Sequence, residues 1–173
     1  MPRRLEFFFD CVSPFSYLAN SQGAAIAERT GAELVYRPFL LGGVMQATGN
    51  QPPATLPARG KYMPKDIGRW VRRYAIPFRF NPSFPMKTLR RSRASSRRTL
   101  ADPAVLRDLI AKAGLDPAPL LAAAATKPIK EKLKANTAEA VERGAFGAPT
   151  FFVGDEIFFG NDRLDFVEEV LRA

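Results

Sequence analysis

The sequence predicts an α/β fold, and two segments at opposite ends of the chain carry this prediction. Near the N-terminus, a strand, a helix and a second strand follow one another within residues 5–37. Near the C-terminus, a helix, two strands and a last helix occupy residues 127–171, with Pro149 directly before the first of these strands. The chain has 173 residues, which suits one domain with room for a small insertion. We therefore expect the helices between the two segments to form that insertion.

The N-terminal segment is predicted to be a right-handed βαβ unit. The apolar run Leu5–Asp10 is typical of a buried strand, and Glu33–Arg37 alternates and is rich in β-forming residues. Between them, Pro14–Arg29 has a helical pattern, which Gly31 ends. Two strands joined by a helix within so few residues are expected to be parallel.

Ser13 and Pro14 lie in the tight turn between the first strand and the first helix. Proline is favourable at a first helical position, because its missing N–H would have no partner there. The other free N–H groups and the positive end of the helix make this turn a possible anion site, to which Ser13 adds a hydroxyl. The alternative is that Ser13 only caps the helix. On this stretch alone, the cap is the favoured interpretation.

The middle of the chain is predicted to be mostly helical. Asn50 is a polar residue on a loop rich in turn formers, where its simplest role is a left-handed turn. Residues 90–98 are a run of Arg and Ser without apolar periodicity. We interpret this run as an exposed charged loop rather than a nucleic-acid patch, because no aromatic residues alternate with the arginines. The expected helices are Pro64–Tyr74, Ala104–Ala113 with Asp102 as its cap, a helix opened by Asp116-Pro117, and Lys127–Arg143.

The C-terminal strands are expected at Thr150–Val153 and Ile157–Phe159. A proline that opens a central strand suits a first position or a cis turn. A cis Ala148–Pro149 bond would expose the N–H and C=O of Ala148, which could then pair with an extended peptide ligand. Asn161 and Asp162 precede the last helix. One of them is expected to cap it, and a helix start can also bind an anion.

Composition excludes several kinds of chemistry. The chain has no histidine and one cysteine, Cys11, which excludes Ser-His-Asp triads, Cys-His pairs, histidine-bound zinc and an internal disulfide framework. A net charge of +9 favours anionic partners. No signal peptide or membrane span is recognised, so we expect a cytoplasmic protein.

Four segments together resemble a known family. Residues 144–151 include the proline before the third strand, as in the thioredoxin fold, and Ser13–Tyr17 lies where DsbA-type oxidoreductases carry Cys-Pro-x-Cys-Tyr. Both cysteine positions are serine here. More specifically, the chain resembles 2-hydroxychromene-2-carboxylate isomerases and the related kappa-class glutathione transferases. The matching segments are residues 9–19, residues 38–43 with 48–53, residues 144–151 and residues 159–164.

The resemblance implies a thioredoxin-like domain, formed by residues 1–40 and 126–173, with a shortened helical insertion, residues 41–125. It also implies glutathione as cofactor, with its thiol at Ser13, its cysteinyl backbone at Ala148 and its γ-glutamyl end at Asn161 and Asp162. The implied glutathione-binding set is Ser13, Asn50, Ala148, Pro149, Phe159, Gly160, Asn161 and Asp162, with Ser13 as the catalytic residue and no metal.

The implied reaction belongs to the breakdown of naphthalene-type aromatic compounds. The isomerase converts 2-hydroxychromene-2-carboxylate to trans-o-hydroxybenzylidenepyruvate, by addition of the glutathione thiolate, bond rotation and elimination. Ser13 would stabilise the thiolate rather than attack, because no base is evident beside it. The expected partners are a small anionic aromatic substrate and a possible second copy of the chain, with no nucleic acid and no membrane.

Two other functions stay open. One is conjugation or peroxide reduction, as in kappa-class transferases. The other is a non-catalytic, truncated thioredoxin-like module that binds anions or nucleic acid. The chain departs from the family at Lys87-Thr88-Leu89, where relatives have Asn-Thr-Leu followed by a helix that walls the acceptor pocket; here the Arg/Ser run follows instead. The departure makes glutathione binding a firmer expectation than isomerase activity.

Overall fold

The structure is a computed structural model that describes residues 3–80 and 102–173. The chain separates into two compact units: residues 1–78 with 133–173 form one, and residues 79–132 form the other. The predicted division into a thioredoxin-like domain and a helical insertion stays a prediction.

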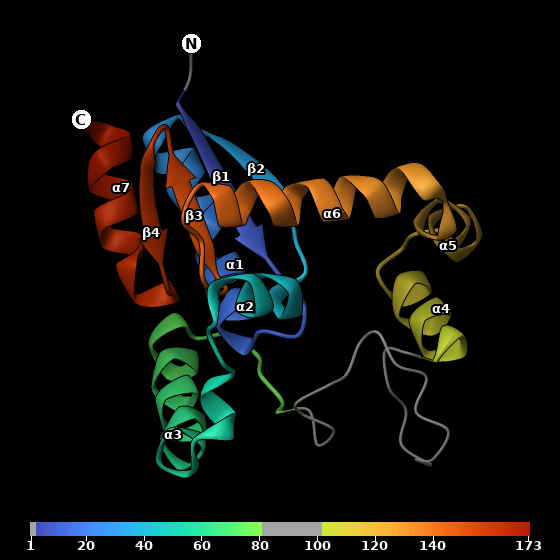
Figure 1. Ribbon diagram of the computed structural model, residues 1–173, viewed down its shortest axis with the longest axis horizontal. Coiled ribbons are helices and arrows are strands. Elements are labelled where there is room, and N and C mark those ends of the chain that lie inside the picture. The colour runs from blue at the N-terminus through green and yellow to red at the C-terminus, as the bar shows by residue number, and fades with distance from the viewer. Residues whose placement is uncertain (1–2, 81–101) are drawn as a thin grey trace. The chain divides into compact units, whose positions relative to one another are not determined.

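A four-stranded mixed sheet forms the centre of the first unit (Figure 1). Its order is β2 (Glu33–Pro38), β1 (Arg4–Phe9), β3 (Thr150–Val153) and β4 (Glu156–Phe159). β1 and β2 are parallel and joined by helix α1 (Pro14–Thr30), whereas β3 is antiparallel to both β1 and β4. The predicted βαβ unit and the two C-terminal strands are therefore confirmed.

Each face of the sheet is covered by its own apolar cluster. α7 (Leu164–Arg172) packs with α1 on one face, and α2 (Leu41–Thr48) packs with the C-terminal part of α6 (Lys127–Glu142) on the other. Successive β1 residues alternate between the two clusters, as the pleat of a strand requires. The first cluster contains Leu5, Phe7, Ala19, Ile26, Phe151, Val153, Leu164, Val167 and Leu171; the second contains Phe8, Phe39, Val44, Ala140, Ala145, Ala148 and Phe152.

α3 (Pro57–Tyr74) begins one and a half to two turns earlier than predicted, after the short 3₁₀ turn η1 (Pro53–Thr55). The prediction placed its start at Pro64, from the helical spacing of Ile67, Trp70, Val71 and Tyr74. Pro57 takes that position instead, and the helix continues through Pro64, while its Met63 and Ile67 are buried. Tertiary packing of this apolar face thus outweighs the backbone hydrogen bond that Pro64 cannot donate.

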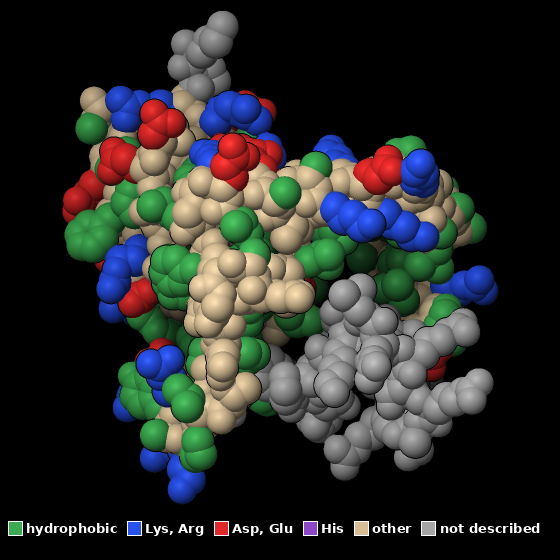
Figure 2. Space-filling model, in the orientation of Figure 1, with side chains coloured by type: hydrophobic (Ala, Val, Ile, Leu, Met, Phe, Trp, Pro, Cys, Tyr) green, Lys and Arg blue, Asp and Glu red, His purple; other side chains and the backbone are tan. Residues whose placement is uncertain are grey.

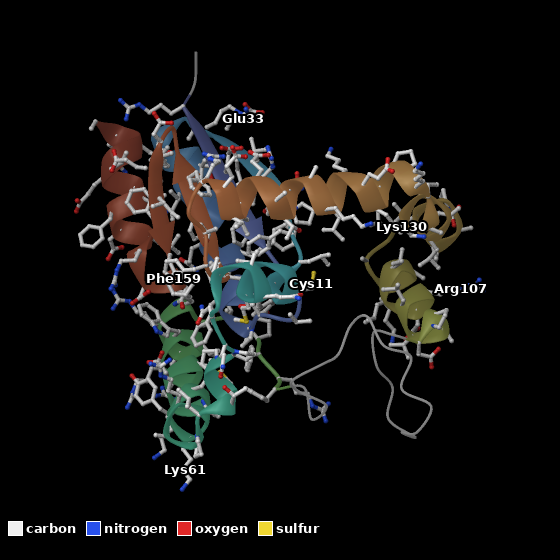
Figure 3. The ribbon with its side chains drawn as sticks, viewed as in Figure 1. Cys11, Glu33, Lys61, Arg107, Lys130 and Phe159 are labelled. Atoms are coloured by element: carbon white, nitrogen blue, oxygen red, sulfur yellow. The ribbon has the colours of Figure 1, made fainter. Side chains whose placement is uncertain are left out.

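α3 is also strongly basic. Its exposed side chains are seen at the foot of the first unit in Figure 2, and Lys61 is labelled in Figure 3. The only acidic residue of the helix is Asp66, which contacts Arg69. The basic residues of α3 are Arg59, Lys61, Lys65, Arg69, Arg72 and Arg73.

The second unit contains α4 (Pro103–Lys112) and α5 (Pro117–Ala125). Asp102 caps α4 by accepting a hydrogen bond from the Ala104 N–H at 2.9 Å, as the sequence predicts. Asp116 caps α5 in the same way. The Arg/Ser run at residues 90–98 lies outside the described residues. Among the helices that are described, none combines the length and apolarity needed to cross a membrane.

A network of ion pairs joins α6 to the sheet. Arg37 of β2 contacts Glu6 of β1 and Glu139 of α6. Arg143, which follows α6, contacts Glu6 at 2.7 Å and Glu139 at 3.3 Å. Its guanidinium also lies 3.8 Å from the centre of the Phe152 ring. The network fixes the end of α6, and hence the start of the loop that leads to Pro149.

Glu168 of α7 is expected to stabilise the fold in a pH-dependent way. Hydrogen bonds from Arg29 of α1 and then from Arg172 lower the pKa of Glu168 to about 2, from the usual 4.5. A lowered carboxyl pKa stabilises the folded state above pH 4.5, and this contribution is lost as the pH falls toward 2. Because the Arg29 side chain is 51% exposed, solvent screens the pair. We therefore expect Glu168→Gln to lower the unfolding free energy at pH 7 by only about 1 kcal/mol.

Urea unfolding at several pH values tests this prediction. The difference between wild type and Glu168→Gln should shrink as the pH falls toward 2, where Glu168 is protonated in the unfolded state and about half protonated in the folded state. Glu169→Gln removes the same charge from the next, exposed position and is the matched control. A Glu168→Gln effect that equals this control at pH 7, or that persists at the lowest pH, would contradict the role given to the Arg29–Glu168 pair.

Candidate functional site

Ser13 is held in place by the start of α1 and by the loop before β3. Ser13 is 6% exposed and is the N-cap of α1. Its Oγ accepts a hydrogen bond from the Ser16 N–H at 3.2 Å. The same Oγ donates to the carbonyl of Ala148 at 3.2 Å. The predicted cap is therefore confirmed. The hydroxyl also touches a backbone group that lies 135 positions further along the chain, a contact that sequence reasoning missed.

The Ala148–Pro149 peptide bond is cis, as predicted. The loop that carries it is ordered by short hydrogen bonds: Ala145 N–H donates to the Ala140 carbonyl at 2.8 Å, and the Thr150 hydroxyl donates to the Gly147 carbonyl at 2.8 Å. Ala148 is 9% exposed, and Pro149 is buried. The Ala148 carbonyl thus faces the Ser13 hydroxyl from a rigid support.

Asn161 and Asp162 lie in the 3₁₀ turn η2 (Asn161–Arg163), between β4 and α7. Gly160, with φ of +102°, turns the chain out of β4, and its N–H donates to the Pro149 carbonyl at 3.0 Å. The expectation that Asn161 or Asp162 caps the last helix is wrong. Arg163 occupies the N-cap position of α7, because η2 separates the two residues from the helix. The N–H group of Gly160 thus fixes η2 beside the cis proline.

Asn161 is almost completely buried, whereas Asp162 is exposed. The Asn161 residue is 3% exposed, and its backbone carbonyl accepts a hydrogen bond from the Tyr74 hydroxyl at 3.1 Å. Within the described residues, its side-chain Nδ2 has no hydrogen-bond partner. One carboxylate oxygen of Asp162 pairs with Arg163 at 2.8 Å. The turn therefore offers an unused amide donor next to a solvated carboxylate.

Asn50 joins the end of α2 to the cis-proline loop. Its Nδ2 donates to the Phe146 carbonyl at 2.8 Å, and its Oδ1 accepts from the Gln51 N–H at 2.8 Å. The expected left-handed turn is formed by Gly49, with φ of +69°, and not by Asn50. The side chain of Asn50 instead connects the end of α2 to the cis-proline loop through its hydrogen bond to Phe146. Sequence reasoning found this residue but not its partner.

Phe146 and Phe159 form an exposed aromatic pair beside this loop. Their ring centres are 4.5 Å apart, and each residue is about 40% exposed. Phe159 is labelled at the end of β4 in Figure 3. A Cβ atom on Gly147 would lie 2.6 Å from the Phe159 ring, so a side chain at Gly147 would force the ring to move. Sequence reasoning named Phe159 as a site residue and missed Phe146. The one feature of the sequence that could have indicated Phe146 is its position directly before Gly147, in the loop that leads to Pro149.

The predicted site residues therefore form one connected set. Ser13 contacts Ala148, the carbonyl of Pro149 contacts Gly160, and Asn50 reaches the loop through Phe146. All these residues belong to the first unit. Chemically, the set offers one buried hydroxyl at the start of α1, one peptide edge beside a cis proline, and the turn η2 with an amide and a carboxylate.

Cys11 is an exposed free thiol next to the turn, and we expect it to react slowly. Partial burial and then the charge of Asp10 raise the pKa of this thiol above 9.0. It is therefore neutral at pH 7.5, and only the thiolate is nucleophilic. Alkylation by iodoacetamide should be slower than alkylation of free cysteine and should speed up as the pH rises. Cys11→Ser is the blank, and a rate at neutral pH above that of free cysteine would contradict the assignment.

Comparisons with known proteins identify the fold and the family of the chain. The family model of the DSBA-like thioredoxin domain matches residues 4–97 and 94–172. A 2-hydroxychromene-2-carboxylate isomerase of Sphingobium xenophagum is 33% identical over 99% of both chains, and one of Pseudomonas putida is 30% identical over 96% of this chain and 93% of its own. Glutathione S-transferase kappa 1 of Rattus norvegicus is 29% identical over 98% of this chain and 91% of its own.

A solved structure of a 2-hydroxychromene-2-carboxylate isomerase superposes with a TM-score of 0.78, at 27% identity, over 97% of this chain and 94% of that chain. The alignment with the Sphingobium relative spans 193 positions, more than the 173 residues of this chain. It therefore includes positions that this chain lacks. With nearly complete coverage on both sides, the chain belongs to the 2-hydroxychromene-2-carboxylate isomerase family of proteins with a DsbA-like thioredoxin domain.

Proposed function

We propose that the protein is a glutathione-dependent isomerase that converts 2-hydroxychromene-2-carboxylate to trans-o-hydroxybenzylidenepyruvate. One observation carries this proposal: the buried hydroxyl of Ser13 donates to the carbonyl of Ala148, directly before cis Pro149. The group that would stabilise a thiolate is thus in contact with the peptide edge that would hold the cysteinyl residue of glutathione. The relatives named as this isomerase support the choice of reaction.

Glutathione would enter this arrangement by exchanging hydrogen bonds. The cysteinyl N–H of the ligand would donate to the Ala148 carbonyl, which in the free protein accepts from Ser13 at 3.2 Å. The Ser13 hydroxyl proton would then turn toward the sulfur, while its oxygen continues to accept from the Ser16 N–H. Ser13 is therefore able to donate to a thiolate without losing its cap of α1.

The same geometry accounts for ionisation of the thiol without a histidine. A free thiol has a pKa of about 8.5, so only a few per cent is thiolate at neutral pH. A hydrogen bond from Ser13 to the anion contributes roughly 1.5–3 kcal/mol, and the start of α1 adds roughly 0.3–1 kcal/mol. Because one pKa unit equals about 1.36 kcal/mol, the pKa of bound glutathione would fall by roughly 1–3 units. The bound thiol would then be largely ionised at neutral pH.

The γ-glutamyl end would lie at η2. The unused Nδ2 of Asn161 would donate to its carboxylate, and the exposed carboxylate of Asp162 would pair with its ammonium group. The hydrogen bond between Gly160 and Pro149 fixes the distance between this turn and Ala148. Asn50 would act mainly by tethering the loop, because both ends of its amide are already used there.

The reaction needs no oxidant and consumes no glutathione. The thiolate adds to the double bond of the ring-opened enone, and the electron pair of that bond moves to the carbonyl oxygen. The former double bond is now single and rotates. Return of the electron pair then expels the thiolate and forms the trans product. The role of Ser13 in this sequence is to accommodate the sulfur charge before addition and after elimination.

A second candidate function is conjugation of glutathione to electrophiles, as the kappa-class relatives suggest. The same thiolate would serve this reaction, but the glutathione would stay bonded to the acceptor through its sulfur.

The test that separates the two functions is to follow 2-hydroxychromene-2-carboxylate by absorbance with and without glutathione. We expect turnover only with glutathione, and inhibition by S-methylglutathione. If the isomerisation rate equals that of the protein-free solution, the isomerase is excluded; glutathione loss with electrophiles would then favour the transferase.

A further inference from the structure

Ser16 is a second serine at the start of α1, one turn after Ser13, and its hydroxyl is unusual. The residue is 3% exposed, and its Oγ has no hydrogen-bond partner in the described part of the chain. Its backbone N–H is engaged with the Oγ of Ser13 at 3.2 Å. A buried hydroxyl without a partner lowers stability, so such a group needs an explanation.

Helical structure alone does not leave this hydroxyl free. Serine and threonine inside a helix commonly donate to a carbonyl one turn earlier. In α1 itself, Ser21 donates to the Leu18 carbonyl at 2.6 Å, and Thr30 donates to the Ile26 carbonyl at 2.8 Å. Ser16 makes no such bond. The free hydroxyl is therefore specific to the first turn of α1, where the candidate site lies.

A second unpartnered group lies in the turn η2 of the same site. Three buried side-chain atoms lack a partner among the described residues: Ser16 Oγ, Arg37 Nε and Asn161 Nδ2. Ser16 lies at the start of α1, which is hydrogen-bonded to Ala148 through Ser13. Asn161 lies in η2, and Gly160, directly before this turn, is hydrogen-bonded to Pro149. α1 also packs against η2. Polar groups without partners thus gather where a ligand would supply them.

We propose that Ser16 is a positioning residue for the thiolate, acting through Ser13. In the free protein the Ser16 hydroxyl makes no hydrogen bond within the described residues, to Ser13 Oγ included. When glutathione binds and the Ser13 hydroxyl turns from Ala148 toward the sulfur, the Ser16 side chain rotates and donates to Ser13 Oγ, whose second lone pair is free. A hydroxyl that accepts a further hydrogen bond becomes a stronger donor itself. The two serines thereby form a short chain of hydroxyls that ends on the sulfur. This inference rests on the proposed binding of glutathione.

The test measures the pKa of bound glutathione from the ultraviolet absorbance of its thiolate. We expect Ser16→Ala to raise this pKa by about half a unit to one unit. Ser16→Thr, which keeps a hydroxyl, should restore the wild-type value. In a Ser13→Ala background, Ser16→Ala should change nothing further, because its effect passes through Ser13. Ser21→Ala is the matched control and should leave the pKa of bound glutathione unchanged.

Thermal unfolding without glutathione separates this role from a structural one. Ser16→Ala should leave the midpoint unchanged or raise it, since the lost hydroxyl has no partner in the free protein, whereas Ser21→Ala should lower it. If wild type lowers the pKa of bound glutathione and Ser16→Ala lowers it by the same amount, the inference about Ser16 is overturned while the proposed function stands. A lowered midpoint in Ser16→Ala would also overturn it. A wild type that leaves the glutathione pKa unshifted would overturn both the inference and the proposed function.

Discussion

Replacing Ser13 by alanine is expected to raise the pKa of bound glutathione by about 1–2 units and to slow turnover at pH 7 roughly 5- to 30-fold. The hydroxyl is the group that would donate to the sulfur anion, and Ser13→Ala removes it while leaving the positive end of α1 in place. With a higher pKa, a smaller fraction of the thiol is ionised at neutral pH. The loss should therefore appear in kcat more than in affinity.

The pH profile makes this prediction specific. The wild-type rate should level off above the lowered pKa of its bound thiol, whereas the rate of Ser13→Ala should continue to rise through a higher pH range. The two rates should approach each other at high pH, where the thiol is ionised in both proteins. A Ser13→Ala variant with the wild-type profile, or with a loss that is equal at every pH, would contradict thiolate stabilisation by Ser13.

The loss of the helix cap needs its own control. Ser13→Ala also removes the hydrogen bond from the Ser16 N–H, and loss of an N-cap costs about 1 kcal/mol of stability. Asp102→Ala removes an equivalent cap, the 2.9 Å bond from the Ala104 N–H at the start of α4. It should lower stability by a similar amount and leave the bound thiol unchanged. If Asp102→Ala also raises the pKa of bound glutathione, the effect of Ser13→Ala on this pKa is explained by lost stability and not by a lost hydrogen bond to the sulfur.

The sequence was sufficient for those parts of the fold that depend on neighbouring residues. The spacing of Leu5–Asp10 and Glu33–Arg37 requires a parallel βαβ unit, and the aspartates at Asp102 and Asp116 mark helix starts by their own side chains. The start of α3 was missed because the apolar spacing that predicted the helix, from Ile67 to Tyr74, lies wholly after Pro64. Burial of Met63, which no local rule supplies, accompanies the extension of the helix back to Pro57.

The site shows the same division between local and distant causes. Ser13 as a cap and the cis bond at Pro149 follow from local chemistry, and both are confirmed. The contact between Ser13 and Ala148 joins residues 135 positions apart, and the tether from Asn50 to Phe146 joins residues 96 apart. Such pairs depend on strand order and on how helices pack. Resemblance to a family placed them in one site, but it did not give their hydrogen bonds.

Asp162→Asn is expected to weaken glutathione binding about 10- to 100-fold, the loss of one charge-assisted hydrogen bond. One carboxylate oxygen of Asp162 pairs with Arg163 at 2.8 Å. The other would accept from the γ-glutamyl ammonium group. Because the proposed site of the sulfur is at Ser13 and Asp162 would contact only the γ-glutamyl end, the pKa of the bound thiol should change little. Calorimetric titration with glutathione measures both quantities, as affinity and as protons released.

Asp165→Asn is the matched control for this change. Asp165 lies three residues later, in the first turn of α7, is exposed, and carries the same charge. It shares the electrostatic field of this helix start, so an effect of net charge alone would appear equally in both variants. We expect Asp165→Asn to bind like wild type. If both variants weaken binding equally, the γ-glutamyl group is held by the field of α7 rather than by Asp162. If neither does, glutathione does not reach η2, and the binding set must end at Ala148 and Pro149.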